Sequence, residues 1–393
     1  MNKQNENDVC ISGIGVASVF GDTLDEFIKG MNNSKSESTY ISDEHILKDK
    51  QIPAFKAPFQ AESENSEARI LSMGKKAICD VIKDRNSEQL PNVDRICLIV
   101  GSGMGLVDQY YYNENKCSDP DYFGSLADKL STITDLNCDA VYIGNACAAG
   151  SQAISYGMDL LKSDRYDLVM VGGIDILSQA AYAGFLRLNA IDLDGCKPFD
   201  RRRKGIAIGE GAAFFALERR NCIEPNGNIY CSLPGSGVTC DACHIVQMNP
   251  DGKEAIRAMD QALFLSGIEK KDVDLIVAHG TGTTQNDKIE SQMINQYFED
   301  HVSDIYVTAP KGAIGHTGGA SGAFGVLVAI IAISTGMIPP ICNLEEQDSE
   351  CNVSLVSECD FKHKVKLAMV NAFAFGGTNV VILCKREEPG DNQ

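Results

Sequence analysis

The sequence has little positive charge: 35 lysines and arginines stand against 54 aspartates and glutamates, which gives a net charge of −19. A chain this acidic repels nucleic acids and anionic membranes, so we expect neither as a partner. The chain also lacks an apolar leader, since it begins MNKQNENDV, and its 15 cysteines show no paired framework. Together these features predict a protein of the reducing cytoplasm.

A metal-binding pattern is missing as well. Cys240 and Cys243 form a C-x-x-C pair, but no second pair at similar spacing exists, so no metal site is predicted. One uncharged run, residues 317–344, is long enough to suggest a membrane span. It is rich in glycine at its start, it ends at Pro339-Pro340, and it has no partner span, so we expect a buried core helix instead.

A repeated pattern of strands, glycine-rich turns and helices is present in the 393 residues. VDRICLIV followed by GSGMG resembles the later VDLIVAH followed by GTGT. Strands alternating with helices predict an α/β protein. Its two similar halves are expected at residues 1–228 and 229–384, with a disordered polar tail at 385–393. Residues 34–65 are polar and irregular, and we expect surface loops there.

The stretch GNACAAGS, residues 144–151, is the strongest candidate for chemistry. An apolar strand precedes it, a tight turn carries Cys147, and a helix-forming run extends from Ala148 to Lys162. Unpaired N–H groups at a helix N-terminus favour a thiolate, so the pattern predicts a lowered pKa for Cys147. Small neighbouring residues leave room for a substrate to reach the sulfur.

Two histidines later in the chain complete this candidate site. His279 and His316 each follow a predicted strand, as Cys147 does, so the repeat is expected to bring all three to one cleft. A thiolate beside two imidazoles permits acyl transfer followed by attack of a carbanion. Backbone N–H groups at Cys147 and in the turn that begins at Phe375 are expected to form an oxyanion hole. Either histidine alone would more often be a core or surface histidine than a catalytic one.

Four motifs in order, NACAAG, HGTGT, KGAIGH and NAFAFGGTN, resemble the β-ketoacyl-acyl-carrier-protein synthases of the thiolase superfamily, in the elongating Cys-His-His branch. The resemblance covers nearly the whole chain. It implies two pseudo-twofold-related halves in a five-layer αβαβα fold. It also implies an acyltransferase that holds an acyl group on Cys147. His279 and His316 would promote decarboxylation of malonyl-acyl carrier protein, and the resulting enolate would extend the chain by two carbons.

Further roles follow from the resemblance by position. Lys311 would set the electrostatics of the cleft, and Asp287 and Glu290 would form a structural network. The residues expected to contact the substrate or its pantetheine arm are Thr281, Thr283, Phe375, Met104, Gly376 and Gly377. No tightly bound cofactor is implied, because substrates arrive on the phosphopantetheine of an acyl carrier protein. A homodimer is expected, and the active half of a heterodimer with a chain-length factor is the alternative.

Two departures from the family pattern bear on the pathway. Gly325 stands where the family usually has a glutamate that pairs with the lysine, so Lys311 would need another acid, with Glu290 as a candidate. Basic residues expected to dock the carrier protein are few. Docking would depend on the following residues, of which the last four also fit a solvated loop: Lys75, Lys76, Arg201, Arg202, Arg203 and Lys204. These departures favour a polyketide or polyene line over general fatty-acid elongation. A non-catalytic acyl-carrier scaffold is the remaining alternative.

Overall fold

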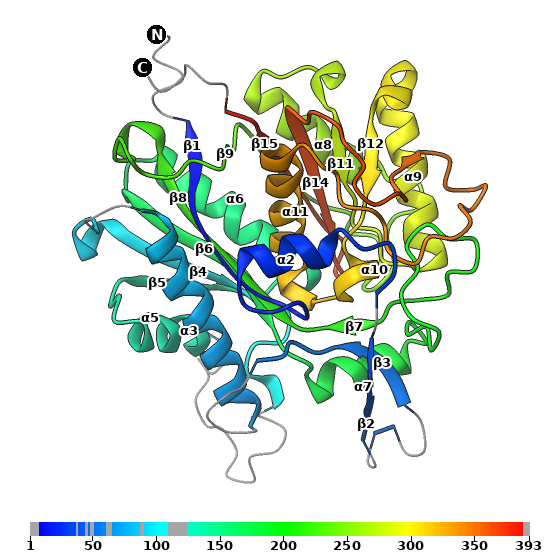
Figure 1. Ribbon diagram of the computed structural model, residues 1–393, viewed down its shortest axis with the longest axis horizontal. Coiled ribbons are helices and arrows are strands. Elements are labelled where there is room, and N and C mark those ends of the chain that lie inside the picture. The colour runs from blue at the N-terminus through cyan, green and yellow to red at the C-terminus, as the bar shows by residue number, and fades with distance from the viewer. Residues whose placement is uncertain are drawn as a thin grey trace.

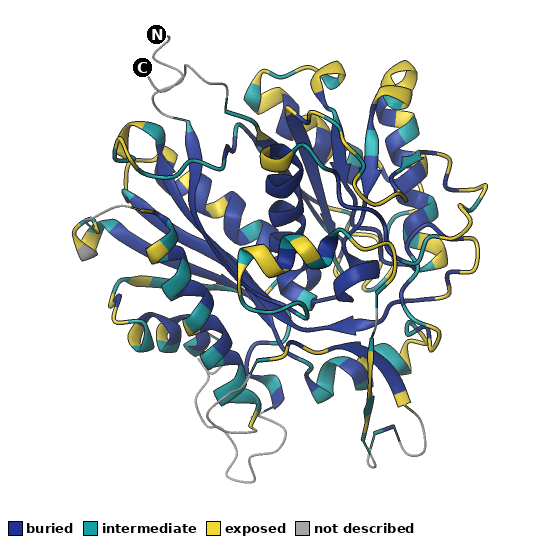
Figure 2. Ribbon diagram, in the orientation of Figure 1, coloured by how far each residue is buried: buried dark blue, intermediate teal, exposed yellow. Residues whose placement is uncertain are grey.

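The computed structural model describes residues 8–36, 38–43, 46–47, 51–59, 65–86, 90–108 and 124–387. Two halves, each a sheet with helices, lie side by side, and helices α6 and α11 lie near the middle of the molecule (Figure 1). The long central strands are apolar and almost wholly buried (Figure 2), which is typical of sheets covered on both faces.

The first half forms five neighbouring strands in the order β1-β8-β6-β4-β5. The first three run antiparallel to their neighbours, whereas β6, β4 and β5 run parallel. Their bounds are β1 Val9–Ala17, β4 Ile96–Gly101, β5 Asp139–Ile143, β6 Leu168–Asp175 and β8 Gly211–Arg219.

The second half repeats this arrangement as β10-β15-β14-β11-β12, with the same antiparallel and parallel pairs. The short strand β9 pairs with both β1 and β15 and so joins the two halves. The strands are β9 Cys231–Ser232, β10 Ser236–Cys240, β11 Leu275–Val277, β12 Tyr306–Thr308, β13 Ser354–Leu355, β14 Leu367–Phe373 and β15 Thr378–Lys385. The internal repeat seen in the sequence is therefore confirmed.

Alternating side chains divide the helices into layers. On β6, Val169 and Val171 belong to the apolar cluster that includes α6 and α11, whereas Leu168 and Met170 pack with α3 and α5. On β14 the same alternation separates α11 from α8 and α9. The helices are α3 Ser66–Asp84, α5 Ser125–Ile133, α6 Ala149–Lys162, α8 Lys253–Ser266, α9 Thr284–Phe298 and α11 Ser321–Thr335. Helices and sheets therefore alternate in five layers, as predicted.

Helix α11 is the uncharged segment that could be mistaken for a membrane span. Residues Gly318–Thr335 are long and apolar enough by composition, but 83% of them are buried inside the protein. The helix packs against α6 and the strands of both halves (Figure 2). The prediction of a buried core helix is confirmed.

The remaining elements lie around this core. Residues 34–65 were predicted to be loops, but β2 and β3 form there, and β3 pairs with β7 to bury Ile52, Ala54 and Phe55. These elements are α2 Leu24–Met31, β2 Thr39–Ser42, β3 Gln51–Phe55, α7 Gln179–Arg187, β7 Ile208–Gly209, α10 Lys311–Ile314, and the 3-10 turns η1 Val93–Arg95, η2 Ala146–Ala148, η3 Arg220–Cys222, η4 Lys270–Asp272, η5 Glu299–Asp304 and η6 Gly318–Ala320.

The predicted polar tail begins too early. Lys385 is the last residue of β15, the N–H of Arg386 donates to the Lys366 carbonyl at 2.7 Å, and Glu387 forms an ion pair with Arg220. The first three residues of that tail are therefore held by the folded chain, Lys385 and Arg386 by the second half and Glu387 by Arg220 of the first. Residues 388–393 lie outside the described part of the chain.

Candidate active site

Cys147 lies at a tight turn between β5 and α6. Strand β5 ends at Ile143, the 3-10 turn η2 carries the cysteine, and α6 begins two residues after it. Ala146 has a φ of +42°, a strained value for a residue with a side chain. The Thr378 hydroxyl donates to Asn145 Oδ1 at 3.2 Å, so the second half of the chain helps to hold the turn. The cysteine is thereby placed at the first turn of a helix, as the motif predicted.

Burial raises the pKa of the Cys147 thiol to about 11. The positive charge of Lys311 and hydrogen bonds from the N–H groups of Phe375 and of Cys147 itself act in the opposite direction. The lowered pKa predicted from the helix N-terminus is therefore wrong for the free chain, because lost solvation outweighs these contacts. Both N–H groups nevertheless reach the sulfur, which is where the sequence places an oxyanion hole.

His279 follows β11 in a turn that the buried Glu290 holds. The Glu290 carboxylate accepts the N–H groups of His279 and Gly280 at 2.8 and 2.9 Å. On the other side, Lys311 Nζ lies 3.2 Å from the ring nitrogen Nδ1 of His279 and donates to its carbonyl oxygen. Because an ammonium group can only donate, Nδ1 accepts and Nε2 carries the proton of the ring.

His316 follows α10 and has the same ring tautomer for a different reason. The N–H of Gly318 donates to His316 Nδ1 at 3.2 Å, and the Ser321 hydroxyl lies 3.0 Å from the same nitrogen, so the proton again lies on Nε2. Burial, followed by the charge of Lys311, lowers the pKa of both histidines well below 6.5, and both rings are neutral at pH 7. The ring centroids of His279 and His316 are 5.8 Å apart, with the planes at 83°.

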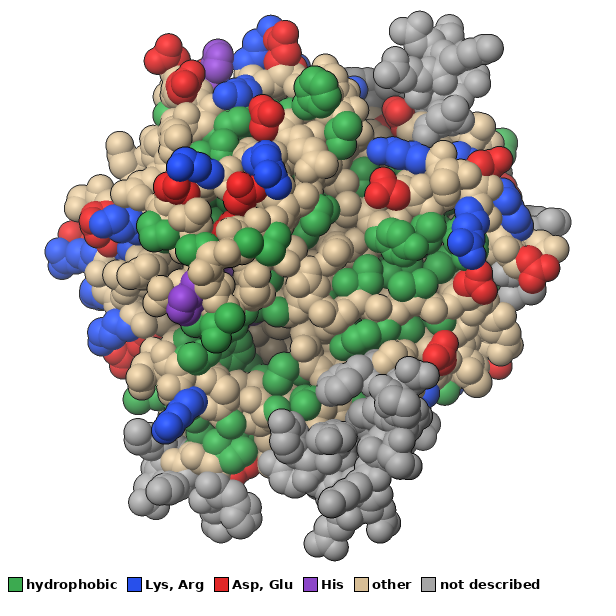
Figure 3. Space-filling model, turned by 180° about the vertical axis from the view of Figure 1, so that it is seen from behind, with side chains coloured by type: hydrophobic (Ala, Val, Ile, Leu, Met, Phe, Trp, Pro, Cys, Tyr) green, Lys and Arg blue, Asp and Glu red, His purple; other side chains and the backbone are tan. Residues whose placement is uncertain are grey.

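One cleft of about 360 Å³ brings Cys147, His279 and His316 together. The predicted pantetheine contacts Thr281 and Thr283 also line it. Phe375 lies beside the cysteine, and apolar residues complete the wall, namely Phe185, Leu188, Ile206, Val246, Met248 and Ile289. Seen from behind, the surface of the protein is hollowed near its centre, and hydrophobic side chains gather around the hollow (Figure 3). The site therefore suits a thin, mostly apolar ligand that carries an acyl group.

Four of the residues predicted for catalysis or substrate contact lie outside the cleft wall. Lys311 lies behind His279. Met104 does not line this cleft, and its role as a limit to the acyl pocket stays a prediction. Gly376 and Gly377 have φ values of +87° and +85° and form the turn that carries Phe375. Their contact with the substrate stays a prediction.

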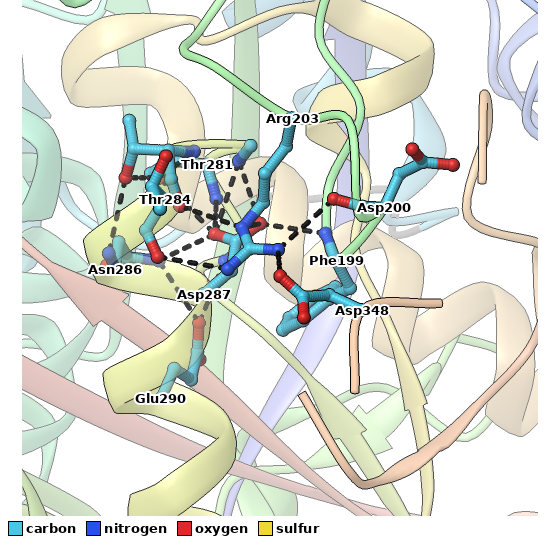
Figure 4. Close-up of polar contacts among 12 residues, drawn as sticks. Phe199, Asp200, Arg203, Thr281, Thr284, Asn286, Asp287, Glu290 and Asp348 are labelled. Atoms are coloured by element: carbon cyan, nitrogen blue, oxygen red, sulfur yellow. Dashed lines mark hydrogen bonds and ion pairs between the residues drawn. The ribbon is translucent and has the colours of Figure 1, made fainter. Parts of the chain in front are cut away.

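Asp287 and Glu290 form the buried network predicted for them (Figure 4). Asp287 accepts the N–H groups of Phe199, Thr281 and Gly282 and thereby shapes the HGTGT loop. Ion pairs among the described residues include none between Lys311 and Glu290, so the candidate partner named for Lys311 does not contact it directly. The two groups are linked through His279.

Arg203 is not available for docking a partner, contrary to the expectation from the basic cluster. Its side chain is 1% exposed and forms ion pairs with Asp348 and Asp287 (Figure 4). The same guanidinium donates to the carbonyl oxygens of Thr283 and Thr284 at 3.2 and 3.0 Å. Arg203 therefore supports the loop that carries the pantetheine contacts.

The other docking candidates lie at the surface, where most have acidic neighbours. Arg201 pairs with Glu346, Arg202 with Asp200 and Glu345, and Lys204 with Asp194, while Lys76 pairs with Asp80 and Asp22. Lys75 is exposed. Of these five, Lys204 also lines the cleft.

Two residues near the site were missed by the sequence analysis. Phe185 of α7 lies with its ring 5.8 Å from that of Phe375 and 6.0 Å from that of His316, and no motif marks it. Asp175 ends β6 and is 2% exposed; its only signal was an acid at the end of the apolar run VMVGGID. Within the described ranges, no group of three or more histidines, cysteines or acids could hold a metal ion.

Comparison with known proteins gives a consistent set of relatives. Residues 81–221 match the family described as beta-ketoacyl synthase, N-terminal domain, and residues 230–345 match its C-terminal domain. The chain is 30% identical to 3-oxoacyl-[acyl-carrier-protein] synthase 2 of Synechocystis, over 96% of this chain and 98% of that protein. It is 34% identical to nodulation protein E of Rhizobium meliloti, over 62% and 61%.

Solved structures agree over nearly the full length. The ishigamide ketosynthase/chain length factor superposes with a TM-score of 0.86 at 28% identity, covering 98% of this chain and all of that one. The ketosynthase ApeO in complex with its chain length factor ApeC, from Xenorhabdus doucetiae, gives a TM-score of 0.82 at 25% identity, covering 97% and 98%.

Proposed function

The chain belongs to the β-ketoacyl synthase family of condensing acyltransferases, and from this premise we propose how its own residues carry out the condensation. Cys147 attacks the thioester of an acyl group on a carrier phosphopantetheine. The acyl group passes to the sulfur, and the thiol proton passes to the departing carrier thiolate. The N–H groups of Cys147 and Phe375 stabilise the oxyanion formed during this transfer.

The second half-reaction uses the two histidines. Malonyl-carrier protein loses CO2, and the electron pair of the broken C–C bond becomes an enolate. The Nε2–H groups of His279 and His316 donate to the developing oxyanion, which two neutral donors in a dry cleft can stabilise. The enolate carbon then attacks the acyl carbon on Cys147, the C–S bond breaks, and the sulfur takes up a proton. The product is a β-ketoacyl-carrier protein.

One observation carries this proposal: Cys147, His279 and His316 line the same cleft, with both ring protons on Nε2. The test is mass spectrometry of the products formed from acyl- and malonyl-carrier protein. Cys147→Ala should reduce condensation by more than about 10³-fold. Cys222→Ala, which removes an exposed cysteine elsewhere, should leave it unchanged. A β-ketoacyl product from Cys147→Ala would refute the role given to the sulfur.

A carrier protein is the proposed partner for both substrates, and no tightly bound cofactor is proposed. The surface cations Lys75, Lys76, Arg201, Arg202 and Lys204 are its candidate docking residues. Lys204 is favoured among them because it also lines the cleft. If it contacts the acidic carrier protein itself, Lys204→Glu should raise the KM for acyl-carrier protein and leave acylation by a short acyl-pantetheine unchanged. Equal effects on both substrates would exclude docking.

A second ketosynthase-like chain is the other proposed partner, with a homodimer as the first expectation. β5 is an edge strand in the described part of the sheet, its Val141 and Ile143 are half-buried, and Tyr156 on the neighbouring α6 is 42% exposed. An apolar edge of this kind favours pairing with another chain. Light scattering should give a dimer that Val141→Lys dissociates and that Tyr40→Lys, on β2, leaves intact. A monomer would favour the heterodimer alternative.

For the pathway, we favour a polyketide or polyene line in the cytoplasm. Gly325 departs from the fatty-acid pattern, and the ishigamide ketosynthase/chain length factor is among the structural relatives. Incubation with carrier-bound acyl groups of graded length, followed by mass spectrometry, would reveal the preferred chain. If the protein only binds acyl carriers, neither acyl-Cys147 nor CO2 will form, and the scaffold alternative would replace catalysis.

A further inference from the structure

Asp175 is a buried carboxylate that accepts four hydrogen bonds. At the end of β6 its carboxylate accepts the Ser102 hydroxyl at 2.6 Å and the N–H groups of Gly103 and Met104 at 2.8 and 3.0 Å. It also accepts the N–H of Gly319 at 2.5 Å. The side chain is 2% exposed and forms no ion pair within the described residues. A buried carboxylate without a cation is costly, and four donors are the compensation it receives.

These contacts connect Asp175 to His316. Gly318 has a φ of +55°, and a Cβ at that position would lie 2.4 Å from Asp175 Oδ2, so the carboxylate leaves room only for glycine. The N–H of this same Gly318 is the donor to His316 Nδ1. The carboxylate therefore holds the turn of Gly318 and Gly319, whose Gly318 N–H acts together with the Ser321 hydroxyl, 3.0 Å away, on His316 Nδ1.

The charge of Asp175 also acts on the sulfur. Burial is the largest cause of the raised pKa of Cys147; the charge of Lys311 then lowers that pKa, and the charge of Asp175, a smaller cause, raises it. Asp175 thus contacts neither the substrate nor the reacting atoms, but it affects the turn beside His316 and the pKa of Cys147.

We propose that Asp175 is a positioning residue for the condensation. By binding the N–H of Gly319 and the 102–104 loop, it holds the turn in which Gly318 donates to His316 Nδ1, so that the ring proton stays on Nε2. The inference rests on the proposed function, because it needs Cys147 and His316 in the roles given above. That function fails separately, if Cys147→Ala still condenses.

The test is Asp175→Asn in the full chain, with three readouts: malonyl-carrier decarboxylation, the pH midpoint of Cys147 alkylation by iodoacetamide, and ¹⁵N NMR of labelled histidine. Decarboxylation should fall about tenfold or more, because the donor to the enolate is misplaced. The alkylation midpoint should move down by about one pH unit, because a nearby negative charge is lost. The His316 signals should change from one tautomer to a mixture.

The matched control is Asp108→Asn. Asp108 is also buried and accepts three donors, Ser178 Oγ and the N–H groups of Gln179 and Ala180, but it lies at the start of α7 without contact to His316. The Asp108→Asn variant should leave all three readouts unchanged.

A wild-type alkylation midpoint and a wild-type His316 tautomer in Asp175→Asn would overturn the proposal. If that variant does not fold, Asp175→Glu decides: it keeps the charge, so the midpoint should stay and decarboxylation should fall, and wild-type decarboxylation would overturn it.

Discussion

Lys311 Nζ lies 3.2 Å from His279 Nδ1, and the same ammonium donates to the carbonyl oxygen of His279. Two contacts to one residue fix both the ring and the backbone of that histidine. Because both contacts are to His279, the buried Lys311 side chain lies behind this histidine and does not line the cleft.

The two histidines receive the same protonation state by different means. His279 takes a hydrogen bond at Nδ1 from a side-chain cation, and His316 takes one from a backbone N–H. A buried acid stands behind each turn, Glu290 for the first and Asp175 for the second. Neutral imidazoles with a fixed Nε2–H present the same donor to an oxyanion over a wide pH range.

Removal of the Lys311 charge should shift the acid limb of the activity profile. Lys311 is, after burial, the second cause of the lowered pKa of His279. In Lys311→Met that pKa should rise, so His279 should become protonated at a higher pH than in the wild type. We therefore expect malonyl decarboxylation to be lost at a higher pH as the solution is acidified. Lys29→Met, on the exposed face of α2, is the control. An unmoved acid limb would contradict the role of the charge.

The reactivity of Cys147 should follow its raised pKa. With a pKa of about 11, the thiolate is only about one part in 10⁴ at pH 7, so alkylation by iodoacetamide should be slow there and rise about tenfold per pH unit up to about pH 11. Peptide mass spectrometry can follow Cys147 and the exposed Cys222 in one sample. A rate that is already constant between pH 8 and 9 would show that the free protein holds a thiolate.

The sequence was sufficient where the information is local or periodic. The turn at Cys147, the repeat of the two halves and the buried helix α11 each follow from a short stretch of residues. The pKa of Cys147 could not be predicted in this way, because its burial depends on segments such as the Phe375 turn, more than 200 residues away by number. Strand β3 was missed because Pro53 and its polar flanks suggest a loop, whereas its pairing partner β7 lies at residues 208–209.

Arg203 illustrates the same limit. In the sequence it is one of four consecutive cations, and nothing local distinguishes it from Arg201. Its partners Thr283, Thr284 and Asp348 come from 80 to 145 positions away. Only the folded chain shows that one cation of the run is buried while its neighbours face solvent.

Gly325 should not accept the glutamate that the family usually has there. A Cβ at this position would lie 2.7 Å from Val370 Cγ1, and the next neighbour is a methyl group of Val277. Gly325→Glu would bury an unpaired carboxylate among valines, and we expect it to lower the free energy of unfolding by more than about 3 kcal/mol in urea titrations. Gly184→Glu, at an exposed glycine of α7 with nothing within 4 Å, is the matched control. A stable Gly325→Glu protein would mean that Lys311 can reach the new acid.

Arg203 and Arg201 should respond in opposite ways to removal of the side chain. Arg203→Met leaves Asp348 and the carbonyl oxygens of Thr283 and Thr284 without their donor, so the unfolding free energy should fall by about 3 kcal/mol. The KM for carrier substrates should rise because the loop with the predicted pantetheine contacts loosens.

Arg201→Met removes only an exposed pair with Glu346, so stability should change by less than about 1 kcal/mol. If Arg201 docks the carrier protein, the KM of the Arg201→Met variant for acyl-carrier protein should be raised at low salt and should match that of the wild type at high salt. Equal stability of the two variants would contradict the structural role of Arg203.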